Sequence, residues 1–165
     1  APVPVRGAAM LYSLGCDTPL GRLTFYQRDD AVVLLKYPGD DFFPDAVRRE
    51  TPLLQTAARQ LTEYFAGERK VFTFPIRPQG TPFFQTVWQT MVREIPYGET
   101  RSYGQVGLLA GYPRHARGVG AANRGCPISI IIPCHRVIAA GGKNGGYGGN
   151  LDAKRFLLDL EAAYK

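Results

Sequence analysis

A cysteine and a histidine stand side by side at Cys134 and His135, separated only by Pro133 from the apolar run 128–132. The thiolate is the attacking form of cysteine, and a neighbouring imidazole can take the thiol proton, so this pair could supply a sulfur nucleophile. Arg136 adds positive charge that also favours the thiolate. The alternative is an ordinary packed cysteine, because free cysteine is among the residue types most often buried.

A carboxylate further along the chain could complete the set. The stretch 151–160 has the apolar spacing of a helix and is followed by Glu161, which could orient His135 as the third member of a Cys-His-acid arrangement. Before it lies the glycine-rich loop 141–149, whose one aromatic residue suits a pocket wall close to a flat ligand. The candidate catalytic residues are therefore Cys134, His135 and Glu161.

The element that must present the nucleophile is the β-branched run between Pro127 and Pro133. Its length and composition predict a short buried strand or extended segment that delivers Cys134 to the edge of a pocket. Earlier in the chain, residues 83–94 are predicted to form a helix with an apolar core face. Ser102 is expected to cap a helix through Leu109, and a turn at 111–113 leads to a second helix from about 114 to 122. Two short helices joined in this way predict a helix-turn-helix, with an ordinary αα-hairpin as the alternative.

The first half of the sequence predicts a sheet and not a set of helices. Three β-prone runs separated by turns indicate a small antiparallel sheet, and Cys16 is expected in a turn as an unreactive structural thiol. An amphipathic helix stopped by Gly67 follows, then a further strand candidate and a linker. The runs are 8–14, 22–27 and 31–37, the helix is 52–66, the strand candidate is 71–76 and the linker is 77–82.

These elements predict an α+β protein, a small amino-terminal sheet with a helix joined to a mostly helical carboxy-terminal part. We expect two domains, 1–80 and 81–165, with the proline-rich residues 1–9 as a loose terminus or an added remnant. No window approaches the ~20 apolar residues of a membrane span. The three cysteines are an odd number without framework spacing, which favours a reducing compartment and a cytoplasmic protein.

The net charge of +6 is unevenly distributed. Residues 1–80 carry 10 Lys and Arg against 9 Asp and Glu, whereas residues 81–165 carry 10 against 5. No acidic residue occurs between Arg101 and Leu151. A basic span without acids around a reactive thiol suits a polyanion, so nucleic acid is the expected partner. Its basic residues are Arg101, Arg114, Arg117, Arg124, Arg136 and Lys143.

Four motifs follow one another in the second half: Ala116 to Asn123, Pro133-Cys134-His135-Arg136-Val137-Ile138, Gly146-Tyr147-Gly148-Gly149, and Leu157-Leu158 to Glu161. In this order they resemble the O6-alkylguanine-DNA alkyltransferases. The close resemblance covers roughly residues 81–161, and Asp17 to Gly21 and Tyr64 to Gly67 extend it more loosely into the first half. It implies a ribonuclease-H-like amino-terminal domain and a suicide DNA repair protein. Such a protein flips O6-alkylguanine out of duplex DNA and transfers the alkyl group once, irreversibly, to Cys134.

The resemblance also implies roles for individual residues. Tyr103 matches the tyrosine beside the phosphate of the flipped nucleotide, and Arg117 matches the arginine that enters the vacated stack. Glu161 orients His135, which draws the proton from Cys134 through a water in the family. DNA binding further involves Arg114, Arg124, Gly120 and Ala121, and the guanine pocket involves Tyr147, Gly148, Val137 and Asn123.

Two positions depart from the family pattern. Gly148 replaces a hydroxyl residue found in some relatives, so a backbone N–H contact could survive there, whereas a side-chain contact would be lost and the preferred alkyl size is left open. Cys126 stands eight residues before Cys134, where the family typically has an asparagine that acts as a hinge between the recognition helix and the active-site segment. Some relatives bind zinc in the amino-terminal domain. This chain has only two histidines, and we expect neither a metal nor a cofactor.

The expected partner is double-stranded DNA bearing O6-alkylguanine, with O4-alkylthymine as a second candidate base. We expect a monomer that does not bind membranes, in the cytoplasm or, in a eukaryote, in the nucleus. Two rival functions are a non-catalytic module that recognises alkylated DNA and a thiol hydrolase using Cys134, His135 and Glu161. Relatives that only bind lesions have tryptophan in place of the nucleophile, so Cys134 disfavours the first.

Overall fold

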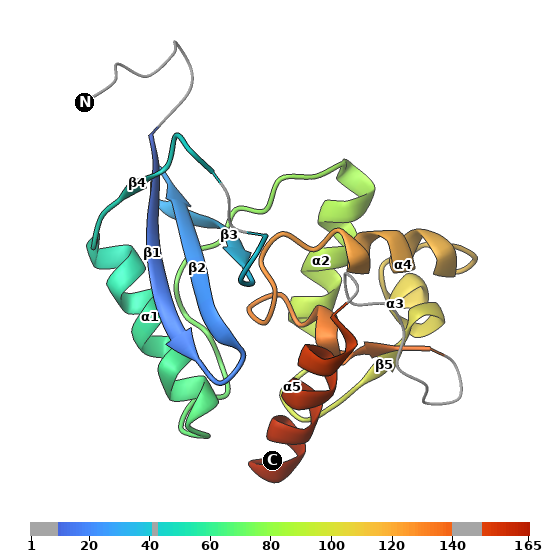
Figure 1. The fold of residues 1–165 in the computed structure, drawn as a ribbon. Helices are drawn as coiled ribbons and strands as arrows, with labels where there is room; N and C mark the ends of the chain where they lie inside the picture. Colours follow the sequence, from blue (N-terminus) through green and yellow to red (C-terminus); the bar gives the residue numbers. More distant parts are fainter. Residues whose placement is uncertain (1–9, 41–42, 140–149) are drawn as a thin grey trace. The chain divides into compact units, whose positions relative to one another are not determined.

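The computed structural model describes residues 10–40, 43–139 and 150–165. The chain packs as two compact units, the first ending at Pro78 and the second beginning at Gln79 (Figure 1). Within these described ranges no helix is long and apolar enough to cross a membrane. The units differ in architecture, because a sheet organises the first and helices organise the second.

The first unit is a four-stranded sheet in the order β3-β2-β1-β4, with helix α1 packed against it (Figure 1). Strands β1, β2 and β3 form two antiparallel pairs, which confirms the predicted sheet, and the short β4 runs parallel to β1. Leu14 in β1 and its partner Phe25 in β2 are both buried, as expected of a sheet with one covered face. The bounds are Leu11–Thr18 for β1, Gly21–Arg28 for β2, Ala31–Lys36 for β3 and Val47–Arg48 for β4.

Cys16 lies in β1 and not in a turn, so that prediction was wrong. The turn is shorter than the sequence indicated, because Asp17 and Thr18 pair with β2 up to Gly21. The Cys16 thiol is buried against α1, 3.7 Å from the carbonyl oxygen of Ala58. This burial agrees with the expected structural role.

Helix α1, Pro52–Phe65, matches the predicted helix. Thr51 caps its amino terminus by accepting a hydrogen bond from the Leu54 N–H. Gly67 follows its end with φ +78°, a backbone conformation that glycine adopts without strain.

The segment 71–76 is not a strand, contrary to prediction. It makes a single bridge between Ile76 and Val32, with hydrogen bonds from the Val32 N–H to the Pro75 carbonyl and from the Arg77 N–H to the Val32 carbonyl. Pro75 has no N–H to continue a ladder. Phe74 is buried and makes an edge contact with Phe25, so this apolar segment still contributes to the core.

The second unit contains four α-helices among its described residues. Its core is formed by apolar residues that include Trp88, whose ring N–H donates to the Ala122 carbonyl at 2.9 Å and so ties α2 to α4. A two-stranded parallel pair, β5 with β6, joins segments far apart in sequence. The bounds are Pro82–Glu94 for α2, Tyr103–Leu109 for α3, Ala116–Arg124 for α4 and Leu151–Ala163 for α5, with Arg101–Ser102 for β5 and Val137–Ile138 for β6.

Helices α3 and α4 form the predicted tight helical pair. Ser102 caps α3 in a reciprocal capping box with Gln105, and Gly111 turns the chain with φ +88°. Gly107 allows close approach, because a Cβ there would lie 2.9 Å from the Tyr112 carbonyl oxygen. Helix α4 begins at Ala116, two residues later than expected, since the preceding residues still belong to the turn.

Candidate active site and nucleic-acid interface

The segment before the nucleophile is a tight turn, and the predicted strand is wrong. The Ile131 N–H donates to the Ser129 carbonyl, and the Ile132 N–H donates to the Ile128 carbonyl at 3.0 Å. These bonds use backbone groups that a strand would offer to a neighbour. Ile130 adopts φ +74°, a conformation rare for a β-branched residue, so this turn stores backbone strain close to the site.

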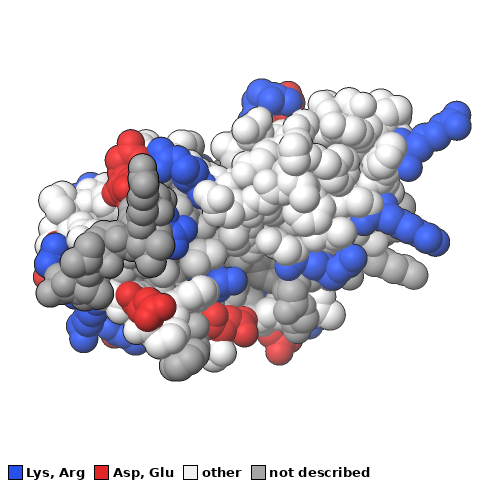
Figure 2. All heavy atoms as spheres, turned by 90° about the horizontal axis from the view of Figure 1, so that it is seen from above, with Lys and Arg blue, Asp and Glu red and all other residues white. Residues whose placement is uncertain are grey.

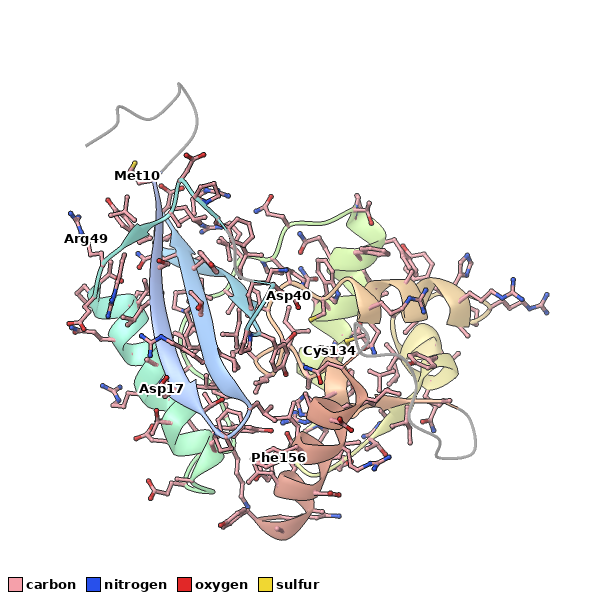
Figure 3. The ribbon with its side chains drawn as sticks, in the orientation of Figure 1. Met10, Asp17, Asp40, Arg49, Cys134 and Phe156 are labelled. Atoms are coloured by element: carbon pink, nitrogen blue, oxygen red, sulfur yellow. The ribbon has the colours of Figure 1, made fainter. Side chains whose placement is uncertain are left out.

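The turn leads into a single 3-10 turn, η1, that spans Cys134–Arg136. Helix α5 packs against η1, and Figure 3 labels Cys134 there. The Cys134 side chain is 0% exposed, so the thiol is enclosed in this structure and does not stand at an open pocket edge.

His135 and Glu161 meet in the core of the unit. The imidazole Nε2 and the Glu161 Oε2 are 2.6 Å apart, and both side chains are buried. Burial lowers the pKa of His135 despite the carboxylate, so the ring is neutral at pH 7 and its Nε2–H donates to Glu161. Nδ1 is then an acceptor, and it has no hydrogen-bond partner among the described residues. This tautomer leaves Nδ1 able to take a proton.

Arg136 also binds Glu161, a role that sequence reasoning missed. Its Nε and Nη2 donate to the two carboxylate oxygens at 2.7 and 3.0 Å, and its Nη1 donates to the Ile95 carbonyl. The Gly98 N–H adds a further bond to Glu161. Burial alone raises the pKa of Glu161, but the hydrogen bonds from His135 and Arg136 hold it well below its usual range. Glu161 is thus held as an anion, and its hydrogen bond to Nε2 can orient the imidazole.

Lys154 is a second residue missed from the sequence. Its side chain is 0% exposed, and its Nζ donates to the Val137 carbonyl at 2.6 Å. A signal was available, because Lys154 shares the buried face of α5 with Leu157 and Glu161 at spacings of three and seven residues.

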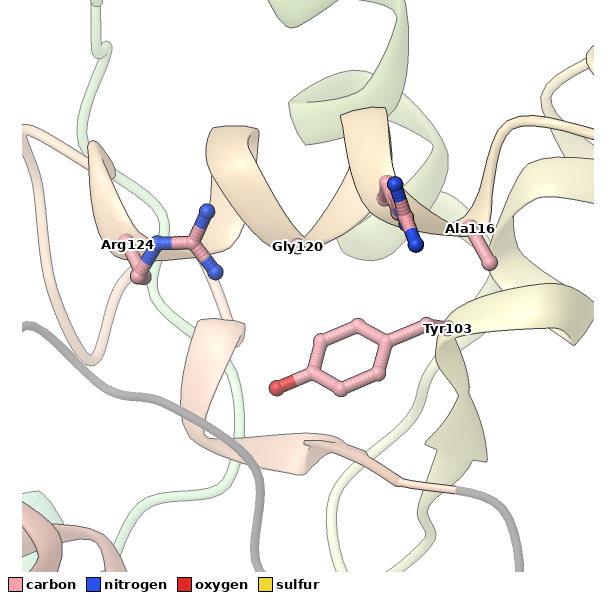
Figure 4. Close-up of a pocket in the computed structure, with 5 residues that line it drawn as sticks. Tyr103, Ala116, Gly120 and Arg124 are labelled. Atoms are coloured by element: carbon pink, nitrogen blue, oxygen red, sulfur yellow. The ribbon is translucent and has the colours of Figure 1, made fainter.

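The predicted DNA-binding residues gather around α4. A surface hollow of about 410 Å³ is lined by Tyr103, Ala116, Arg117, Gly120 and Arg124. In Figure 4 the Tyr103 ring lies beneath α4, between Ala116 and Arg124. A Cβ at Gly120 would lie 3.4 Å from the guanidinium of Arg124, so glycine keeps this face of α4 clear.

The remaining predicted contacts lie elsewhere. Arg114 is exposed, and neither it nor Ala121 lines the hollow. Asn123 and Val137 are buried. Tyr147 and Gly148 lie outside the described residues. In Figure 2, Lys and Arg side chains project on the side where Figure 1 places α4, with no acidic atoms among them.

Chemically, this arrangement can generate a nucleophile and attract an anion. The described residues contain no group of three or more His, Cys, Asp or Glu that could hold a metal ion. The site offers a buried thiol and an imidazole that can accept a proton, in the same unit as a cationic surface.

Cys126 lies just beyond α4, half-buried, and its N–H donates to the Asn123 carbonyl at 3.4 Å. A thiol makes weaker hydrogen bonds than an amide, so we expect a weaker link from α4 to the segment carrying Cys134 than an asparagine would give. We predict that Cys126→Asn raises the free energy of unfolding by about 1 kcal/mol, measured by denaturant unfolding. Lower stability in this variant would show that the thiol suits the site better than an amide.

Comparison with known proteins places both units in one family. The family model for the DNA binding domain of 6-O-methylguanine DNA methyltransferase matches residues 82–163, and that for its ribonuclease-like domain matches residues 10–78. A Bacillus subtilis protein named methylated-DNA–protein-cysteine methyltransferase, constitutive, is 42% identical over 92% of this chain and 96% of its own length. A Methanosarcina acetivorans methylated-DNA–protein-cysteine methyltransferase is 49% identical over 73% of this chain and 76% of its length.

Solved structures agree with the sequence relatives. The crystal structure of Mycobacterium tuberculosis O6-methylguanine methyltransferase has a TM-score of 0.86 and 40% identity, covering 94% of this chain and 95% of that one. The Mycobacterium tuberculosis OGT in complex with DNA matches with the same TM-score and identity over 93% and 94%.

Proposed function

This chain belongs to the 6-O-methylguanine DNA methyltransferase family, and we propose from that premise that it repairs duplex DNA by transferring the alkyl group of O6-alkylguanine to its own Cys134. The observation that carries the residue assignment is the hydrogen bond between His135 and Glu161 beside Cys134, in the unit whose α4 borders the cationic hollow. The base must leave the helical stack before a buried thiol can reach it.

In the proposed reaction, the Cys134 thiol gives its proton to Nδ1 of His135. The thiolate then attacks the alkyl carbon, and a sulfur–carbon bond forms as the carbon–O6 bond breaks. The bonding pair stays with guanine, which takes up a proton in place of the lost alkyl group. The fixed negative charge of Glu161 stabilises the imidazolium between these events.

The surface around α4 supports the proposed recognition of DNA. Arg117 has a flat cationic head that can stack on bases and fill the position of the flipped nucleotide. Tyr103 and Arg124 line the same hollow, and we propose that they contact a phosphate of the DNA. Minor-groove binding by α4 would give little sequence preference, as suits a protein that searches for lesions.

The thioether formed at Cys134 has no activated leaving group, so we predict one alkyl transfer per protein molecule. The test incubates the protein with excess duplex that carries O6-methylguanine with a radiolabelled methyl group. A duplex with unlabelled O6-methylguanine and a duplex with unmodified guanine are the controls. One label per molecule, mapped to Cys134 by peptide mass spectrometry, is expected.

Other outcomes would identify other functions. Label that stays on bound DNA would favour the non-catalytic recognition module, and repeated turnover would contradict a stoichiometric acceptor.

We further propose that the protein acts as a monomer in a reducing compartment such as the cytoplasm, because a free thiol must survive until it meets DNA. Sedimentation of the protein alone and bound to a short duplex tests the monomer.

A further inference from the structure

The ammonium group of Lys154 is enclosed in the core of the second unit. Lysine is almost never fully buried unless something compensates the charge, yet this side chain is 0% exposed. Its bond to the Val137 carbonyl supplies one partner, at 2.6 Å. Val137 follows η1 directly, and its own N–H donates to the Cys134 carbonyl, so Lys154 is held against the turn that carries the nucleophile.

Other charged groups around η1 are already engaged with one another. On α5, Glu161 accepts hydrogen bonds from His135 and from Arg136. The Arg136 guanidinium also lies over the ring of Tyr97, 5.7 Å from its centroid. Arg136 therefore neutralises Glu161, and its guanidinium is occupied by Glu161, the Ile95 carbonyl and Tyr97. The sequence had suggested Arg136 as the cation that favours the thiolate.

Lys154 is instead buried against η1, the turn that carries Cys134. Burial lowers the pKa of Lys154, and the opposing effect that raises it is electrostatic attraction to Cys134. The same ammonium lowers the pKa of His135. A positive charge here therefore favours an anionic sulfur and disfavours a proton that stays on the imidazole.

We propose that Lys154 is a positioning residue for the alkyl transfer: its ammonium stabilises the Cys134 thiolate, while His135 accepts the proton and Glu161 holds the imidazole in place. This assignment rests on the proposed function for its biological meaning, but not for its test. It assigns proton transfer to His135 and stabilisation of the thiolate to Lys154 in place of Arg136.

The test measures the rate at which iodoacetamide, a small neutral probe, alkylates Cys134 as a function of pH, with peptide mapping to exclude the other thiols. Lys154→Met removes the charge and the hydrogen bond, whereas Lys154→Gln keeps an N–H donor for the Val137 carbonyl. Both should move the midpoint of the profile up by about one pH unit or more. Arg155→Met, which removes an exposed charge from the same helix, should leave it in place.

Three results would overturn the proposal: unchanged midpoints in both Lys154 variants, a shift in Lys154→Met alone, or an equal shift in Arg155→Met. If neither Lys154 variant folds, the ultraviolet difference titration of the wild type against Cys134→Ser gives the thiol pKa directly. A value at or above the ordinary thiol pKa of about 8.5 would contradict the proposal. Because the probe needs no DNA, failure here is distinguishable from failure of alkyl transfer from DNA.

Discussion

Glu161→Gln is expected to lower the free energy of unfolding by about 3–5 kcal/mol and to slow alkyl transfer strongly. The amide keeps the shape of the side chain but removes the negative charge that faces His135 and Arg136. The Arg136 guanidinium would then stay buried without a counter-charge. Removing one partner of a buried ion pair destabilises the fold because it leaves the other charge uncompensated. Denaturant unfolding and single-turnover transfer to Cys134 measure the two effects.

Asp159→Asn is the matched control, because it removes a carboxylate from an exposed position of the same helix. Its effect on unfolding should stay within about 0.5 kcal/mol. A double variant, Glu161→Gln with Arg136→Met, separates stability from chemistry. Removing the stranded cation should recover much of the lost stability, whereas transfer should remain slow because His135 still lacks its carboxylate. If the Glu161→Gln variant transferred the alkyl group at the wild-type rate, the carboxylate would have only a structural role.

Arg117→Ala is expected to slow repair of duplex DNA about tenfold or more. Unstacking a base costs a few kcal/mol, and a side chain that fills the gap slows its return, while each 1.4 kcal/mol lost is about tenfold in an equilibrium. Reaction with the free O6-methylguanine base should be unchanged, because no stack has to be opened. The measurement compares transfer from duplex and from base with wild type and variant.

Arg114→Ala provides the control on the same surface. Arg114 is exposed near the start of α4 and outside the hollow, so its loss should weaken DNA binding and flatten its salt dependence without a separate effect on flipping. Equal losses of Arg117→Ala on base and on duplex would remove the flipping assignment.

Local sequence was sufficient for most elements of the fold. Helix α1 and the capping of α3 by Ser102 follow from apolar periodicity and capping residues, which act within a few positions. The three antiparallel strands follow from short β-prone runs separated by turns. The Cys-His pair and a following helix that ends near an acid were enough to suggest the candidate site.

Two segments with the composition of strands did not form strands. The run 128–132 has the composition of a strand, but its own hydrogen bonds close a turn at Ile130. The segment 71–76 has that composition too, yet Pro75 interrupts the ladder against β3.

The charge arrangement at the site is the clearest case of tertiary control. Arg136 reaches Ile95 and Glu161, which are 41 and 25 residues away, and no local pattern indicates that a guanidinium adjacent to His135 neutralises Glu161. The spacing of Lys154, Leu157 and Glu161 places them on one face of α5, but only the packing of α5 on η1 buries that face. The sequence by itself determined which groups are present. Which cation pairs with Glu161 and which is buried beside η1 depends on tertiary packing, because the strength and partner of a charge are set by what surrounds it in three dimensions.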